Sequence, residues 1–175
     1  LTEARDDAMP IVAPESAGRE GPVPAVKRFD AFDEEVRYTA AVYRKLHDTR
    51  GVPWSDMCVL YCHGWMGEPI TNALAQAGVP FAWLRDTASK RRLRMSEPSV
   101  KVLTMHSSKG LEFPTVATCG VGVLGRDDER TLDDAKLLYV AMTRATENLL
   151  VTMSGTSPFV AKLAAMAEAH GRAVA

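Results

Sequence analysis

The sequence predicts an α/β domain built in three layers, with helices on both faces of a mostly parallel sheet. Short apolar segments of strand length alternate with segments of helical periodicity along most of the chain. Hydrophobic residues make up 46% and charged residues 25% of the 175 residues, the balance of a globular domain with a buried core. Ligands bind such sheets beyond the carboxyl ends of the strands, so the loops after Thr104 and before Asn148 are the first places to look for a site.

The first half of the chain begins with a strand and then alternates with helices. Strands are predicted where the chain is apolar and of strand length, over residues 26–29, 57–61 and 81–84. Apolar residues at helical spacing predict a helix over 32–47. A shorter helix over 70–77 ends at the stop signals Gly78 and Pro80.

The second half continues the alternation. Three more strands are predicted, over residues 100–104, 115–121 and 148–152. The pattern of residues 131–134, Thr-Leu-Asp-Asp, resembles a capping box and predicts a helix that runs to about Thr143. Ser157 as a cap and Pro158 in the first turn predict a final helix to about His170.

Charge is unevenly distributed, although the formal net charge is only −1. Residues 1–20 carry two basic and five acidic side chains, with prolines and no sustained apolar period. We therefore expect residues 1–22 to form an extended arm or linker and residues 23–175 to form the folded domain. Residues 85–101 carry six basic and two acidic side chains. A basic loop of this kind is usually a solvated loop.

Simple counts exclude several classes of protein. No segment approaches about 20 apolar residues, the length of a membrane helix, and the N-terminal residues lack the layout of a secretory signal. Three cysteines cannot form a paired disulfide framework, so we expect a reducing, cytoplasmic compartment. Cys58, Cys62 and His63 are zinc-like ligands without a second pair at suitable spacing, and we predict no metal site. Because the chain begins with Leu1, we expect a fragment of a longer protein.

The first segment with chemical character is residues 104–113, Thr-Met-His-Ser-Ser-Lys-Gly-Leu-Glu-Phe. It follows a predicted strand and is rich in small polar groups. Serine and glycine allow backbone N–H groups to approach a phosphate, and Lys109 adds a positive charge. Composition alone makes this segment a candidate anion site. The alternative is a polar loop with a solvated lysine.

The second segment is residues 137–145, Leu-Leu-Tyr-Val-Ala-Met-Thr-Arg-Ala. Its arginine, Arg144, follows an apolar helix and therefore leaves the core at a fixed angle. A planar guanidinium in such a place suits bidentate contact with a phosphate. The alternative is an arginine that binds the C-terminal carbonyl groups of its own helix.

Together, the two segments resemble the fifth and sixth motifs of UvrD/Rep/PcrA-like superfamily 1 DNA helicases. The resemblance covers roughly residues 25–155 and is sharpest over 100–116 and 134–151. It implies that the chain is the C-terminal, RecA-like motor domain of such a helicase. In this family two RecA-like domains enclose ATP and move along single-stranded DNA.

The resemblance also implies roles for individual residues. Arg144 would be an arginine finger that contacts the γ-phosphate of ATP. Lys109 would approach the same phosphates, Gly110 would allow a tight turn, and Glu112 would accept hydrogen bonds from the ribose. Three residues of the same segment would lie nearer the DNA backbone: Thr104, His106 and Ser107.

The chain lacks other parts that ATP hydrolysis needs. It contains no Gly-x-x-x-x-Gly-Lys-Ser/Thr string, and no acidic pair for Mg²⁺ follows an apolar strand. We therefore expect ATP and Mg²⁺ to be bound mainly by an N-terminal RecA-like domain of the same polypeptide. The isolated fragment is expected to be monomeric and not to hydrolyse ATP.

Some features depart from the family pattern. Residues 62–67, Cys-His-Gly-Trp-Met-Gly, replace an arginine and small polar residues that contact DNA in many relatives. Trp65 could stack on a base instead, or could cover the edge of the sheet. Arg91 and Arg92 of the basic loop are further candidates for DNA contact. The main alternative to a motor domain is a catalytically inactive helicase-like scaffold.

Overall fold

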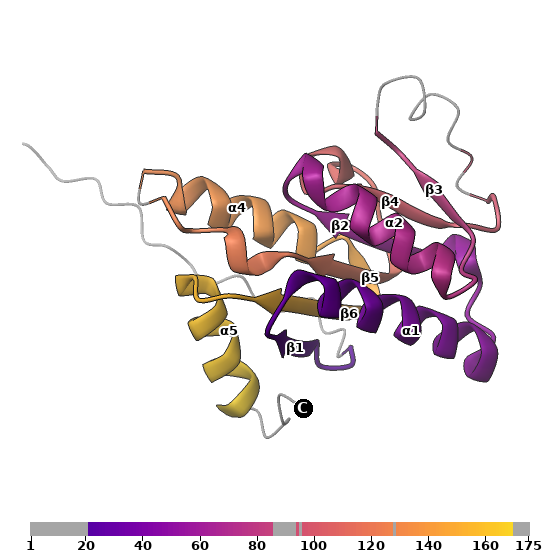
Figure 1. The fold of residues 1–175 in the computed structure, drawn as a ribbon, viewed down its shortest axis with the longest axis horizontal. Coiled ribbons are helices and arrows are strands. Elements are labelled where there is room, and N and C mark those ends of the chain that lie inside the picture. The colour runs from indigo at the N-terminus through magenta and orange to yellow at the C-terminus, as the bar shows by residue number, and fades with distance from the viewer. Residues whose placement is uncertain (1–20, 86–93, 95, 128, 170–175) are drawn as a thin grey trace, which may run out of the picture.

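Six strands form a single sheet in the computed structural model, which describes residues 21–85, 94, 96–127 and 129–169 (Figure 1). In chain order the strands are β1 (Ala25–Phe29), β2 (Met57–Tyr61), β3 (Phe81–Trp83), β4 (Val100–Thr104), β5 (Phe113–Cys119) and β6 (Ala145–Ser154). Their order across the sheet is β1-β6-β5-β2-β4-β3, and every neighbouring pair is parallel. All the strands therefore end at one edge of the sheet, the carboxyl edge, and begin at the opposite edge, the amino edge.

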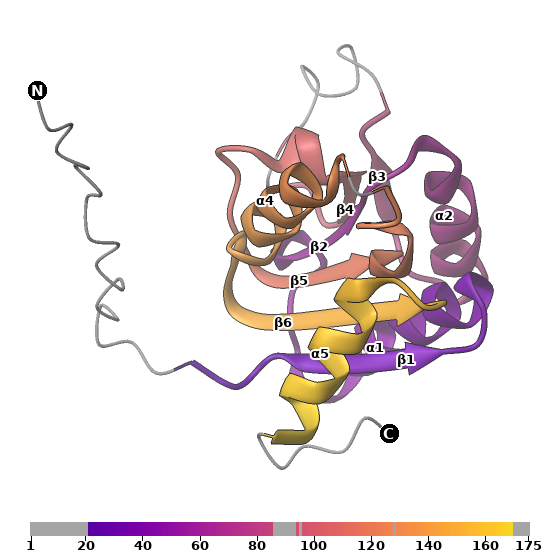
Figure 2. The same ribbon diagram turned by 90° about the vertical axis from the view of Figure 1, so that its left-hand side faces the viewer.

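Helices on both faces of this sheet complete the predicted three layers (Figures 1 and 2). One face carries α1 (Phe32–Arg50) and α2 (Gly67–Gln76), and the other carries α4 (Thr131–Met142) and α5 (Pro158–Ala169). On the first face, Val36 and Ile70 pack in one buried cluster with Val59 of β2. On the second face, Leu138 and Val160 belong to a separate buried cluster. Because both faces are covered, β2 is buried at every residue, as its continuous apolar sequence requires.

All the predicted strands and helices are present, and some of their ends differ from the prediction. β6 begins at Ala145 rather than Asn148 because Ala145 pairs with Phe113 of β5. β5 ends at Cys119, and the next residues form the 3-10 helix η4 (Val121–Val123). α1 continues to Arg50, beyond the predicted end, and the next residue, Gly51, closes it in the left-handed conformation with a φ of 66°.

Two predicted helix caps are wrong in detail. Thr131 is the first helical residue of α4 rather than its cap, and its hydroxyl donates to the carbonyl oxygen of Asp127 at 3.0 Å. Asp134 instead ties the start of α4 to the preceding loop, because its carboxylate accepts the backbone N–H of Gly125 at 2.8 Å. Ser157 precedes α5 as predicted, but its buried hydroxyl has no hydrogen-bond partner among the described residues.

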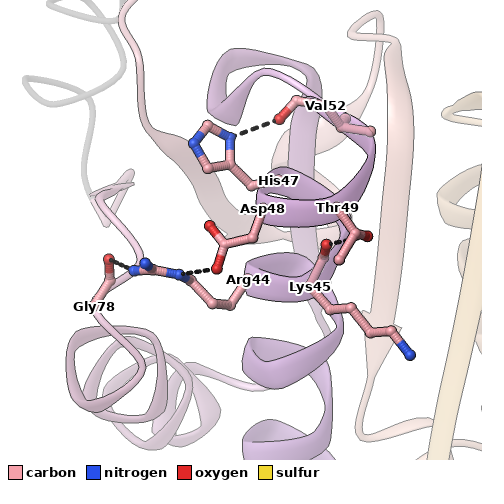
Figure 3. A network of polar contacts seen from close by, with 7 residues as sticks. All are labelled: Arg44, Lys45, His47, Asp48, Thr49, Val52 and Gly78. Carbon is pink, nitrogen blue, oxygen red and sulfur yellow. Dashed lines mark hydrogen bonds and ion pairs between the residues drawn. The ribbon is translucent and has the colours of Figure 1, made fainter.

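The C-terminal end of α1 is attached to its surroundings by side-chain contacts (Figure 3). The Arg44 guanidinium forms an ion pair with Asp48, with Nε and Oδ2 2.7 Å apart, and donates to the carbonyl oxygen of Gly78 after α2 at 3.3 Å. One turn on, the His47 ring lies 2.9 Å from the carbonyl oxygen of Val52 and stacks on Trp54. The contact of Arg44 with Gly78 joins α1 to the end of α2, and the contacts of His47 join α1 to the loop before β2.

The three cysteines are free thiols, and none forms a disulfide. Burial raises the pKa of Cys62 and of Cys119 to about 12 and raises the pKa of Cys58 well above its usual value. A thiol with so high a pKa is protonated at neutral pH. Among the described residues, no helix is both long and apolar enough to cross a membrane.

Candidate functional site

Arg144 lies at the amino edge of the sheet, between the end of α4 and the start of β6. Its guanidinium donates three hydrogen bonds to the chain itself. Nε donates to the carbonyl oxygen of Val140 at 3.0 Å, Nη1 to that of Leu111 at 3.2 Å, and Nη2 to the hydroxyl of Thr143 at 3.2 Å. Arginine has about five N–H donors, so about two remain for a ligand. The guanidinium is half-buried and oriented before any ligand arrives.

Arg144 contacts both the helix and the candidate anion segment. Its bond to Val140 is the contact with the helix's own carbonyl groups that the alternative interpretation predicts. Its bond to Leu111 joins the two segments singled out by the sequence. A second link runs between the backbones, because the N–H of Phe113 donates to the carbonyl oxygen of Arg144 at 2.9 Å. The two segments therefore form one structural unit at the amino edge.

The other predicted nucleotide-binding residues flank Leu111. Lys109, Gly110 and Glu112 are all exposed and lie between the 3-10 helix η3 (Met105–Ser108) and β5. Gly110 adopts a positive φ of 82°, which confirms the tight turn expected there. These residues and Arg144 lie on the same edge of the sheet because β5 and β6 start there side by side.

The predicted DNA-facing residues lie at the other end of the same segment. Thr104 is the last residue of β4, at the carboxyl edge. Its side-chain oxygen accepts the backbone N–H of Ser107 at 3.2 Å and lies 2.8 Å from the Ser107 hydroxyl. Thr104 thereby caps η3, while His106 is exposed. Residues 104–112 thus connect the carboxyl edge to the amino edge.

Trp65 lies in the 3-10 helix η2 (Gly64–Met66), which follows β2 at the carboxyl edge. The ring is 57% exposed and meets Phe32 of α1 edge to face, with ring centroids 5.2 Å apart. Its exposed surface is available for stacking, so the predicted base contact stays a prediction. Arg91 and Arg92, the other predicted contacts, lie outside the described residues.

The sequence reasoning missed a buried carboxylate beneath the carboxyl edge. Glu35 of α1 is fully buried and accepts the backbone N–H of Gly120 at 2.9 Å and the hydroxyl of Ser154 at 2.6 Å. It therefore joins the ends of β5 and β6 to α1. Burial raises its pKa, although both hydrogen bonds act to lower it. A glutamate among apolar helix positions was the available signal.

No metal site accompanies these residues in the described part of the chain, where no three histidine, cysteine, aspartate or glutamate side chains gather in a suitable group. Besides Glu112, the charged residues of the candidate site at this edge are basic. The Arg144 guanidinium, with its remaining N–H donors, and the Lys109 ammonium are positively charged groups of the kind that bind phosphate oxygens.

Both motif segments lie within the match of this chain to a known family. Residues 82–156 match the family model of the UvrD-like helicase C-terminal domain, and this range includes Thr104, Lys109 and Arg144. A probable DNA helicase of Mycoplasma pneumoniae is 25% identical over 165 residues, which cover 89% of this chain and 28% of that protein. The ATP-dependent DNA helicase PcrA of Staphylococcus aureus is 38% identical over 66 residues, covering 33% of this chain and 9% of PcrA. The chain therefore spans less than a third of either relative.

Solved structures show the same architecture. The C-terminal domain of a possible DNA helicase from Lactobacillus plantarum superposes with a TM-score of 0.63 at 25% identity, covering 83% of each chain. The C-terminal domain of the DEAD-box protein Dbp5 has a TM-score of 0.52 at 12% identity and shares the fold alone. The matches confirm the resemblance predicted from the two motif segments: this chain is similar to the C-terminal, RecA-like domain of UvrD-like superfamily 1 DNA helicases, and residues 82–156 carry that domain's signature.

Proposed function

We propose that this chain is the C-terminal motor domain of an ATP-dependent, cytoplasmic superfamily 1 DNA helicase, in which Arg144 completes the ATP site. The observation that carries the proposal is the hydrogen bond from Arg144 Nη1 to the carbonyl oxygen of Leu111. It couples the candidate phosphate-binding arginine to the segment that reaches the opposite edge of the sheet.

The chemistry of Arg144 suits phosphoryl transfer. Charge develops on the transferred phosphoryl group, and a fixed guanidinium stabilises this charge without reorganising. Three hydrogen bonds already orient Arg144 on the protein. Lys109 adds charge toward the same phosphates, and Glu112 accepts hydrogen bonds from the ribose. ATP brings Mg²⁺, and both are bound mainly by the N-terminal RecA-like domain of the same polypeptide.

Single-stranded DNA is the proposed ligand of the carboxyl edge. Thr104, His106 and Ser107 contact its backbone, and the exposed ring of Trp65 stacks on a base. Residues 104–112 connect this edge to Arg144, so closure of the ATP site at one end is transmitted to the DNA contacts at the other.

The test is single-turnover ATP hydrolysis by the full-length protein, with and without single-stranded DNA. The rate stimulated by DNA is expected to fall by about 10³-fold or more in Arg144→Ala. Arg130→Ala is the matched control, because this arginine lies at the opposite end of α4, is 80% exposed and pairs with Asp127. The isolated chain is expected to show no ATP hydrolysis in the same assay.

Two results would contradict the proposal. If DNA does not stimulate hydrolysis, or if Arg144→Ala hydrolyses ATP as fast as the wild type, the protein is a helicase-like scaffold rather than a motor. A hydrolysis rate from the isolated chain equal to that of the whole protein would overturn the expected division of the ATP site between two domains.

A further inference from the structure

Two arginines outside both motif segments meet at the carboxyl edge of the sheet. Arg28 belongs to β1, and Arg126 lies in the loop between β5 and α4. Both lie beside Gly155, the residue that follows β6. Arg28 Nη2 donates to the carbonyl oxygen of Gly155 at 3.3 Å, and a Cβ placed on Gly155 would lie 3.0 Å from Arg126 Nη2. The carboxyl ends of β1, β6 and β5 lie side by side in this order in Figure 2.

We propose that Arg28 and Arg126 form a phosphate-binding site around Gly155, and that its ligand is a backbone phosphate of single-stranded nucleic acid. The proposal rests on the proposed DNA-binding function of this edge and adds residues that neither motif contains. It places a second group of contacts at the β1 end of the edge, away from Thr104.

The hydrogen bonds of the two arginines leave most of their donors available. Among the described residues each guanidinium donates one hydrogen bond, to a backbone carbonyl: Arg28 to Gly155, and Arg126 Nε to Gly122 at 3.1 Å. Each guanidinium has about five N–H donors in a planar fork that matches the geometry of a phosphate. Both side chains are exposed, so a ligand reaches them without any rearrangement.

The positive charge of the pair is not neutralised within the described part of the chain. The ion pairs found there join Arg44 to Asp48, Arg130 to Asp127, and Lys136 to Asp133. The neighbouring carboxylate of Asp127 is thus directed to Arg130 at 3.6 Å and also accepts the backbone N–H of Glu129 at 3.1 Å. Two like charges that meet without a carboxylate gain most from an anion placed between them.

The backbone around the pair is closely packed. Gly122 packs directly on Ser154, because an added Cβ would overlap the Ser154 carbonyl oxygen. Ser154 is in turn bound to the buried carboxylate of Glu35. Gly155 itself has a φ of 84° and no side chain, and a Cβ at this position would come within 3.0 Å of Arg126 Nη2, so glycine suits this close approach of the arginine. The backbone beside the two arginines is therefore held in place by packing and by a buried hydrogen bond.

The position of the pair defines a path for a strand of nucleic acid. Thr104 lies at the end of β4 and Arg28 near the end of β1, and the sheet order separates these strands by β2, β5 and β6. With neighbouring strands about 4.8 Å apart, the two ends of the edge lie about 19 Å apart. At about 3.4 Å per stacked nucleotide, a strand must be about six nucleotides long to touch both ends. Trp65, after β2, lies between them.

The experiment measures binding of oligo-dT to the full-length protein by fluorescence anisotropy over a range of salt concentrations. Two lengths are used, about 4 and about 16 nucleotides, below and above the length that spans the edge. For the longer oligonucleotide, R28Q/R126Q is expected to lower the affinity about five- to tenfold and to reduce the slope of log K against log salt by about 0.7 for each lost phosphate contact. For the shorter one, which reaches only one end of the edge at a time, a smaller change is expected.

Matched variants separate this contact from general effects of charge and folding. Arg50 is the last residue of α1, a helix of 19 residues that begins beside the carboxyl edge, so this arginine lies about 28 Å from that edge. The variant Arg50→Gln removes its exposed charge. It is expected to bind both lengths like the wild type. R28K/R126K retains the charge without the planar fork and is expected to restore the salt slope but only part of the affinity. Thermal unfolding of each variant checks the fold.

Each outcome has one interpretation. If R28Q/R126Q binds the longer oligonucleotide like the wild type, the proposed site is wrong while the DNA-binding function stands. An equal loss at both lengths contradicts the path along the edge to Thr104. If the wild type binds neither length, the proposed function itself fails. If inorganic phosphate raises the Tm of the wild type but not of R28Q/R126Q, while both bind DNA equally, the site takes free phosphate and the nucleic-acid ligand is excluded.

Discussion

The two edges of the sheet use polar groups in opposite ways. At the amino edge, Arg144 is half-buried, makes three hydrogen bonds to its own chain and retains donors for a ligand. At the carboxyl edge, Glu35 is fully buried, and both of its oxygens are occupied by Gly120 and Ser154. The first arrangement presents a group to a partner, and the second holds strands together.

This difference predicts where each kind of substitution acts. Changes around Glu35 should lower the free energy of unfolding, because they leave buried donors without partners or force backbones apart. Changes around Arg144 should leave the fold intact and alter ATP hydrolysis. If substitutions around Glu35 altered only ATP hydrolysis, or substitutions around Arg144 mainly lowered stability, this difference between the two edges would be wrong.

The largest effect is expected from Gly122→Ala. An added Cβ would overlap the backbone carbonyl oxygen of Ser154, which cannot move without displacing the end of β6. We expect a loss of about 3 kcal/mol or more in the free energy of unfolding, measured by urea denaturation of the 175-residue chain. Gly64→Ala is the control on the same edge, since no atom lies within 4 Å of its Cβ position. Equal stability of the two variants would show that η4, which contains Gly122, does not pack closely on Ser154 at the end of β6.

The next effect is expected from Glu35→Ala, which leaves the N–H of Gly120 and the hydroxyl of Ser154 without their acceptor. The expected loss is about 2–3 kcal/mol in the same assay. Glu34→Ala is the matched control, because the neighbouring carboxylate makes only an exposed contact with the N–H of Asp30. A loss of less than about 0.5 kcal/mol in Glu35→Ala, the usual range for surface positions, would remove the basis for calling this edge structurally fixed.

A smaller effect, on activity alone, is expected from Thr143→Val. The change removes the hydroxyl that accepts from Arg144 Nη2 and donates to the carbonyl oxygen of Val140. Looser placement of Arg144 should lower ATP hydrolysis by the full-length protein about tenfold, while stability changes by less than about 0.5 kcal/mol. Thr49→Val is the control, because this exposed hydroxyl also bonds a carbonyl of its own helix but lies on α1 (Figure 3). If Thr143→Val lost stability but kept its ATP hydrolysis rate, the prediction would be wrong.

The smallest effect concerns pH. Because burial raises the pKa of Glu35, the folded chain binds a proton at this site more tightly than the unfolded chain does. The contribution of Glu35 to stability is therefore greatest below the ordinary value of 4.5 and falls as the pH rises toward the folded pKa. Glu35→Gln lacks this titration, so the stability of the wild type relative to it should decline from pH 4.5 upward. Urea denaturation at several pH values measures the decline, and a rise instead would contradict burial as the dominant cause.

Periodicity predicted the elements well because both faces of the sheet are covered. The apolar runs of β2, β4 and β5 reflect this burial directly. The start of β6 was missed because its first residues, Ala-Thr-Glu, are partly exposed at the amino edge, where pairing with β5 rather than burial makes them a strand. The capping box failed at Thr131 because the preceding loop supplies a carbonyl, at Asp127, to its hydroxyl.

The candidate site was only partly predictable. Arg144 and Gly110 carry side-chain or conformational signals that a sequence displays. The acceptors that orient Arg144, however, include the backbone carbonyls of Leu111 and Val140, which any residue supplies. The meeting of Arg28 with Arg126 depends on the order of strands across the sheet, which spacing along the chain does not determine.

The high pKa values of the thiols give the carboxyl edge a built-in reporter. Cys62 follows β2 and Cys119 ends β5, and at pH 8 a thiol of pKa about 12 is ionised to only about one part in 10⁴. Alkylating reagents therefore modify the fully buried Cys119 only when the surrounding segment opens to water. The rate of labelling in native buffer would then measure the free energy of local opening at this edge, without any mutation or attached probe.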